Sequence, residues 1–207
     1  MGFIDRLKVS TNLIKLNWAT LLGVGLAYAS IDLSFMKMMA PLVKRGDISL
    51  TYILLFLLMW LVRVIFLSGY VPLVLDCVKG KKVSISKFGK YINFNNFISF
   101  LCLDAIVMAV MVAGFILLLI PGIYWAAISV FSYFIVGLRP LYKDTFKAIT
   151  DSIDASKGVR WHIFGYQAIY AALTLLCSVS TILSLTLGVV LIAYYWITIG
   201  VLFKERT

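Results

Sequence analysis

Six long apolar stretches alternate with short polar segments along the chain. A bilayer has a hydrocarbon core about 30 Å thick, which takes about 20 helical residues to cross. Because that core offers backbone groups no outside hydrogen-bond partners, each stretch is expected to be a helix. The pattern predicts an all-α polytopic transmembrane bundle that forms one domain over residues 1–207. Its six spans are residues 18–36, 50–75, 97–120, 122–138, 161–181 and 185–203.

Two of these boundaries divide longer apolar runs. Residues 97–138 as one straight helix would reach roughly 60 Å at 1.5 Å per residue, twice the thickness of the core. Pro121-Gly122 is the point where this run can turn back, since proline breaks a helix and glycine permits a turn. In residues 161–203 a segment rich in Ser and Thr divides the run in the same way.

A short amphipathic segment precedes each pair of spans. In the second segment, Ile85, Phe88 and Ile92 have the spacing of one helix face, and the third segment repeats that spacing. We interpret the chain as three copies of an amphipathic helix followed by a hairpin of spans. These helices either lie in the plane of the cytoplasmic interface, basic faces toward anionic lipid, or fold against the bundle. The three segments are residues 3–16, 84–95 and 144–157.

Each amphipathic segment ends in a polar residue followed by an aromatic one. The pairs are Asn17-Trp18, Asn96-Phe97 and Arg160-Trp161. Aromatic side chains with one polar edge favour the headgroup boundary. Trp18, Phe97 and Trp161 are therefore the expected interfacial anchors.

Charge sets the orientation. The chain has 19 Lys plus Arg against 9 Asp plus Glu, 62% hydrophobic residues and a mean hydropathy of +1.01. Fifteen of the basic residues lie in the two termini and the connections on one side, and three lie on the other. By the positive-inside rule both termini are cytoplasmic. Because the cations sit in short connections between spans, the net charge of +10 is a topology signal and not a nucleic-acid surface.

Two charges fall inside the spans, Arg63 and Asp104. A lone ion at the bilayer centre costs at least about 2.5–3.5 kcal/mol, so the two are expected to face each other. Either they form a salt bridge that fixes helix register, or they form a substrate or proton site. Asp32 and Asp76 lie near the ends of spans and are expected to need no partner.

Tyrosines in the later spans suggest a polar cavity. Tyr166 and Tyr170 share a helix face because they are four residues apart. With Gln167, Tyr133 and Tyr194 they either line a cavity or pack as aromatic side chains with one hydrogen bond each. The inventory holds one glutamate, Glu205, and one histidine, His162, with no phosphate loop or metal-ligand cluster. We therefore expect no catalytic residues, no metal and no cofactor.

One region resembles a known family. The segment Ile120-Pro-Gly-Ile-Tyr124, followed by Ala148-Ile-Thr-Asp-Ser-Ile-Asp-Ala-Ser-Lys-Gly158 and then Trp161, resembles the YciC-like bacterial inner-membrane proteins. It is also similar to the membrane domain that precedes some glycerophosphodiester phosphodiesterases. The resemblance covers residues 96–207. It implies a six-helix domain in the bacterial inner membrane and carries over no catalytic residue.

Two functions agree with these features. The first is a non-catalytic membrane protein that acts through membrane lipids or other inner-membrane proteins, as an accessory or subunit of a larger assembly. The second is a small transporter or channel for an amphiphilic or ionic substrate, with Arg63 and Asp104 in its polar site.

Overall fold

A computed structural model describes residues 2–44, 49–117, 119–139, 144–177 and 181–207. Within these ranges every regular element is an α-helix, so the all-α prediction is confirmed. The helices are α1 (Phe3–Lys44), α2 (Leu50–Val78), α3 (Ile85–Tyr91), α4 (Phe94–Leu117), α5 (Leu119–Leu138), α6 (Thr145–Ala155), α7 (Arg160–Cys177) and α8 (Thr181–Lys204).

Helix α1 joins the first amphipathic segment to the first apolar stretch. Its backbone leaves helical geometry once, at Asn17, where φ is −126° and ψ is 16°. This kink lies at the predicted junction of the two segments. Beyond it the helix runs to Lys44 and not to residue 36, because a charged residue such as Lys37 does not by itself end a helix.

The turn predicted at Pro121-Gly122 is displaced. Helix α4 ends at Leu117 and α5 begins at Leu119, so Pro121 and Gly122 lie in the first turn of α5. Proline is tolerated there because the first backbone N–H groups of a helix have no partner within the helix. Helix α7 ends at Cys177 and α8 begins at Thr181. Residues 178–180 of the predicted turn lie outside the described ranges.

The second and third amphipathic segments fold against neighbouring spans. The side chains of Phe88 and Ile92 lie over Gly69 of α2, where an added Cβ would meet them at 2.7 and 2.9 Å. In α6, the Ser152 hydroxyl donates to the Ile128 carbonyl of α5 at 2.5 Å. Helix α3 is shorter than predicted, because the chain leaves helical geometry at Ile92 and α4 already begins at Phe94. Of the two placements considered, the structure favours folding against the bundle.

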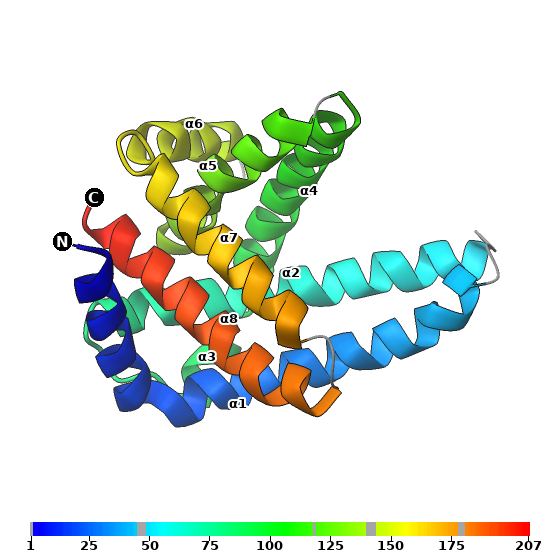
Figure 1. The fold of residues 1–207 in the computed structure, drawn as a ribbon, viewed down its shortest axis with the longest axis horizontal. Coiled ribbons are helices and arrows are strands. Elements are labelled where there is room, and N and C mark those ends of the chain that lie inside the picture. The colour runs from blue at the N-terminus through cyan, green and yellow to red at the C-terminus, as the bar shows by residue number, and fades with distance from the viewer. Residues whose placement is uncertain (1, 45–48, 118, 140–143, 178–180) are drawn as a thin grey trace.

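The first amphipathic segment packs on the last helix of the chain. Arg6 forms a salt bridge with Glu205 at 2.9 Å, and Thr198 donates to Ser10 at 3.1 Å. Tyr194 donates to Thr11 at 3.1 Å, so α1 and α8 run antiparallel. Figure 1 shows the resulting arrangement, with both chain ends together on one side of the molecule.

The polar residue that ends each amphipathic segment bonds back to the segment that precedes it. The side-chain amide of Asn17 donates to the Leu13 carbonyl at 3.2 Å, and that of Asn96 donates to the Tyr91 carbonyl at 2.8 Å. In the third unit, the Arg160 guanidinium donates to the Ile153 carbonyl at 3.1 Å. Each side chain thus satisfies a carbonyl that the end of the amphipathic helix leaves open.

Helices α2, α5 and α8 form the centre of the fold. An added Cβ on Gly200 of α8 would lie 3.1 Å from the Val78 side chain and 3.2 Å from the Phe134 side chain, so the three helices pack closely at this point. Phe131 and Phe134 of α5 pack on Phe203 with ring centroids 5.3 and 5.4 Å apart. The outer ends of the helices diverge from this core, with α1 and α2 running one way and α4 and α5 another (Figure 1).

Four helices in the described ranges are long and apolar enough to cross a membrane. They are Ile4–Lys44, Leu50–Val78, Phe94–Gly114 and Thr186–Lys204, and Gly122–Leu138 is a shorter apolar helix. Their surfaces expose many large apolar side chains, including Leu54, Phe56 and Leu57 of α2. These are the helices of a membrane-spanning protein.

Candidate functional site

Arg63 and Asp104 come together between α2 and α4. The Arg63 Nη2 lies 3.6 Å from Asp104 Oδ1. The two ends of the pair differ in environment, because the Asp104 side chain is fully buried and that of Arg63 is 42% exposed. At 3.6 Å this contact is an ion pair without a hydrogen bond, so Arg63 is loosely held.

Two closer donors satisfy the Asp104 carboxylate. Trp60 Nε1 donates to Oδ2 at 2.6 Å, and the Tyr133 hydroxyl donates to Oδ1 at 2.5 Å. Both oxygens are therefore hydrogen-bonded, which lowers the cost of burying the charge. Sequence reasoning did not single out Trp60. The available signal was its spacing, since it lies three residues before Arg63 and so on the same helix face.

A cavity of about 310 Å³ opens beside this pair. Arg63 and Tyr133 line it, as do Gln167 and Tyr170 among the predicted residues. The lining comes from α1, α2, α4, α5, α7 and α8, hence from every long helix. The remaining lining residues are Tyr28, Phe66, Leu67, Val107, Met111, Ala126, Ser129, Val130, Ile192, Tyr195 and Trp196.

Gln167 bridges two helices at the edge of the cavity. Its Nε2 donates to the Ala126 carbonyl at 3.2 Å and to the Tyr195 hydroxyl at 3.3 Å. Tyr195 stacks on Tyr170, with ring centroids 4.8 Å apart. The cavity wall therefore combines aromatic faces with hydroxyl and amide groups.

Tyr166 and Tyr194 lie elsewhere. Together with Tyr170 they line a separate hollow of about 220 Å³ between α7, α8 and the start of α1. Tyr194 donates to Thr11, and Tyr166 interacts with Arg6. Of the five residues proposed to share one cavity, the structure groups Tyr133, Gln167 and Tyr170 around Arg63 and places the other two at the packing of α1 on α8.

The predicted anchors differ in exposure. Trp161 and Trp18 are exposed, at 84% and 61%, while Phe97 is half-buried and packs on the core. Pro121 and Gly122, predicted as a turn, lie in the first turn of α5.

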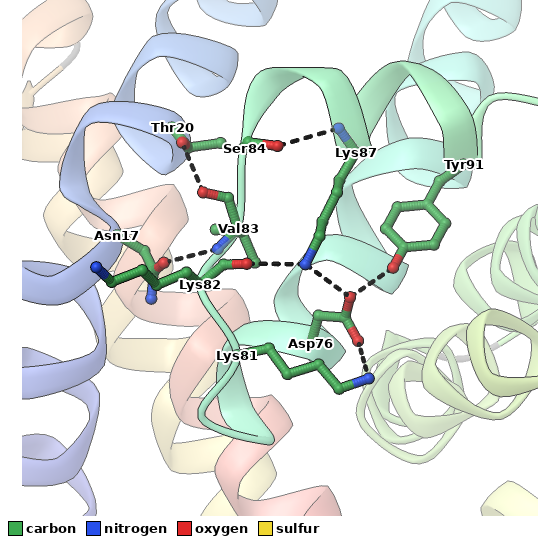
Figure 2. A network of polar contacts seen from close by, with 9 residues as sticks. All are labelled: Asn17, Thr20, Asp76, Lys81, Lys82, Val83, Ser84, Lys87 and Tyr91. Carbon is green, nitrogen blue, oxygen red and sulfur yellow. Dashed lines mark hydrogen bonds and ion pairs between the residues drawn. The ribbon is translucent and has the colours of Figure 1, made fainter.

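A second polar cluster joins α2, α3 and the kink of α1 (Figure 2). Asp76 accepts a hydrogen bond from the Tyr91 hydroxyl at 2.5 Å and lies 3.3 and 4.0 Å from the ammonium groups of Lys81 and Lys87. The expectation that Asp76 needs no partner is therefore wrong, because the chain folds back after α2. Burial, and next the Asp76 hydrogen bond, raise the pKa of Tyr91 to about 12, so this phenol stays protonated and continues to donate.

Asn17 holds the other half of the same cluster. Its Oδ1 accepts from the backbone N–H of Val83 at 3.0 Å, and its Nδ2 lies 3.3 Å from the Cys77 sulfur. Thr20 donates to the Val83 carbonyl at 3.2 Å. As Figure 2 shows, the connection between α2 and α3 is fixed to the kink of α1 through its backbone. This cluster is structural in character, since all its groups have partners within the chain.

Asp32 interacts electrostatically with Arg63 but forms no ion pair among the described side chains, so Asp104 is the carboxylate in contact with Arg63. Across the described residues, no group of three His, Cys, Asp or Glu side chains is arranged to hold a metal ion. The site around Arg63 offers hydrogen-bond donors, aromatic faces and balanced charge, which suits binding of a polar group.

Comparison with protein-family models, with curated proteins and with solved structures finds no match to this chain.

Proposed function

We propose that this chain is a non-catalytic integral membrane protein that binds an amphiphile in the cavity beside Arg63. Six helices cross the membrane as three hairpins, α1–α2, α4–α5 and α7–α8, and both termini lie in the cytoplasm. The resemblance of residues 96–207 to YciC-like proteins supports a location in the bacterial inner membrane, where the protein serves as an accessory or subunit of an assembly.

The observation that supports this proposal is the loose end of the Arg63–Asp104 pair. A salt bridge that only fixes register would be expected to bury both partners and bring them within hydrogen-bonding distance. Here Trp60 and Tyr133 each donate to one oxygen of the carboxylate, and the Arg63 side chain remains 42% exposed beside a cavity. Arg63 thus keeps N–H donors available to a ligand.

The surroundings of Arg63 indicate the kind of ligand. Tyr28, Tyr170 and Tyr195 supply aromatic faces and hydroxyl groups around the cavity. Because Asp104 pairs with Arg63, the site has no excess of positive charge. The ligand is therefore an amphiphile whose polar group accepts hydrogen bonds, with its apolar part between the hairpins and no requirement for net negative charge.

Lipid co-purification tests this proposal. The protein is purified in native lipid, and the retained molecules are identified by mass spectrometry for the wild type, for Arg63→Gln and for Lys37→Gln. Lys37 is the matched control because it lies on the exposed surface of α1, away from the cavity. Loss of one retained species in Arg63→Gln alone, with the fold intact, supports the site. The same retained set in all three proteins contradicts it.

A transporter is the second candidate. The observation that favours it is that one cavity is lined by helices of all three hairpins, so a change in their relative position would change the cavity. Uptake of the co-purified molecule into vesicles, lost in Arg63→Gln, would identify transport. Binding without uptake assigns the accessory role.

A further inference from the structure

Another hollow lies between α5 and α7, apart from the Arg63 cavity and from the hollow beside Tyr166. Its volume is about 410 Å³, and its walls are Ile123, Tyr124, Ala127, Arg160, Trp161 and Phe164. Five of these six side chains are apolar or aromatic. Trp161 is 84% exposed, so its indole extends the apolar wall of the hollow onto the surface of the protein.

Among the described residues of the lining Arg160 is the one that carries a charge, and its hydrogen-bond partners are all neutral. Its Nε donates to the Ser156 hydroxyl at 3.3 Å and its Nη2 to the Ile153 carbonyl at 3.1 Å. Its Nη1 donates to the Tyr124 hydroxyl, and its guanidinium carbon lies 5.6 Å from the centre of that ring. Among the described side chains, no carboxylate forms a salt bridge with Arg160.

The other two units show that this charge is not needed for the local fold. Asn17 and Asn96 occupy the corresponding position and satisfy a carbonyl of the preceding helix with a neutral amide. The third unit places a full positive charge there, beside an apolar hollow. A cation in such surroundings is costly unless an anion accompanies it. A guanidinium has five N–H groups, and three of those on Arg160 are used within the chain.

We propose that this hollow binds an anionic phospholipid. The phosphate accepts hydrogen bonds from the remaining N–H groups of Arg160, and an acyl chain lies between α5 and α7 against Phe164 and Ala127. Trp161 contacts the lipid at the level of its headgroup. Lipid is the occupant because the charge and the apolar walls belong to one continuous hollow. This site is independent of the ligand proposed for Arg63.

The informative variant is Arg160→Asn, which removes the charge and introduces the residue that the other two units already use. Lys157→Asn is the matched control, because Lys157 is three residues away and its ammonium is paired with Asp154 at 2.7 Å. The proteins are incorporated in nanodiscs of phosphatidylglycerol and phosphatidylcholine, and the lipid retained on transfer to detergent is counted by native mass spectrometry.

We expect the wild type and Lys157→Asn to retain phosphatidylglycerol in preference to phosphatidylcholine, and Arg160→Asn to lose about tenfold of that preference. Equal retention of the two lipids by the wild type, or an unchanged preference in Arg160→Asn, would overturn the proposal. Inorganic phosphate that stabilises the wild type as much as phosphatidylglycerol would overturn the lipid assignment.

Two further variants keep the result interpretable. If Arg160→Asn does not fold, Trp161→Ala removes an exposed wall of the hollow without touching the charge, and it must also lower the phosphatidylglycerol preference. Lys37→Gln must leave this preference unchanged, because Lys37 lies on the exposed surface of α1 and outside the lining of the hollow. A preference that is lost in Arg160→Asn and kept in Lys37→Gln assigns the effect to this hollow.

Discussion

Asp104 and Arg63 are partners with unequal roles at the residue scale. Replacing Asp104 by Ala leaves Arg63, Trp60 and Tyr133 without their acceptor, and removal of one partner from a buried pair costs about 3–5 kcal/mol. Replacing Arg63 by Gln leaves Asp104 with two hydrogen bonds and is expected to cost about 1 kcal/mol. Thermal unfolding in detergent should therefore give a much lower melting temperature for Asp104→Ala than for Arg63→Gln.

The double variant Arg63→Gln/Asp104→Asn completes the comparison. If the pair only fixes helix register, the melting temperatures of both single variants fall by similar amounts, and the double variant recovers the lost stability. Equal losses in the two single variants would contradict the unequal roles assigned here.

Asn17 fixes the kink of α1 through one buried side chain. Its replacement by Ala removes the acceptor of the Val83 N–H and the donor to the Leu13 carbonyl. Leaving buried backbone groups unsatisfied costs about 1–3 kcal/mol, so the melting temperature should fall. Asn12→Ala is the control, since Asn12 is exposed on the same helix. Equal melting temperatures for the two variants would contradict the role of Asn17 in fixing the kink.

The pairing of Arg63 with Asp104 was predictable because a charge in lipid has few alternatives. The error at Asp76 has a different cause. Its position near the end of a span suggested that water would satisfy it, whereas Lys81, Lys87 and Tyr91 return to it after the turn at Gly80. Whether these side chains reach Asp76 depends on how the connection folds, and hydrophobic periodicity does not describe the fold of a connection. Which tyrosines share a hollow depends on how each helix is rotated about its axis, and periodicity does not describe that either.

At the scale of elements, α1 and α8 approach each other at one glycine. A Cβ on Gly25 would lie 2.8 Å from the Val189 Cγ1, while a Cβ on Gly23 would meet nothing within 4 Å. Gly25→Ala should therefore destabilise the protein by about 1–3 kcal/mol relative to Gly23→Ala, since overpacking forces neighbours apart. Both variants gain the same helix propensity, so the difference in melting temperature isolates the contact. A Gly25→Ala protein as stable as Gly23→Ala would contradict the close approach.

Element boundaries were predicted where a physical signal marks them. Asn17 separates two segments because polar and apolar periodicity change there, and the structure has its kink at that residue. The turn was predicted at Pro121-Gly122, but both residues lie in the first turn of α5. Proline does not distinguish the two cases, because it is as acceptable in the first turn of a helix as between helices. Whether the amphipathic helices lie in the membrane plane or on the bundle could not be read from their spacing, since one apolar stripe serves both.

At the scale of the whole molecule, one ion pair joins the two chain ends. The Arg6 side chain is 7% exposed and its partner Glu205 is 26% exposed. Glu205→Gln leaves Arg6 without its counter-charge, and we expect a loss of about 1–2 kcal/mol measured as a lower melting temperature. Asp154→Asn breaks an exposed pair and should change stability by less than about 0.5 kcal/mol. A larger loss of stability in Asp154→Asn than in Glu205→Gln would contradict the role of the Arg6–Glu205 pair in joining the two chain ends.

The central claim is that three helical hairpins cross the membrane around one polar cavity, and cysteine labelling from the two faces tests it most directly. Single cysteines are placed at Lys82, Lys44 and Gly122 in a protein whose three native cysteines are replaced. We predict that a membrane-impermeant maleimide labels position 82 from the cytoplasmic face and positions 44 and 122 from the opposite face. Labelling of positions 82 and 122 from the same face would contradict the account.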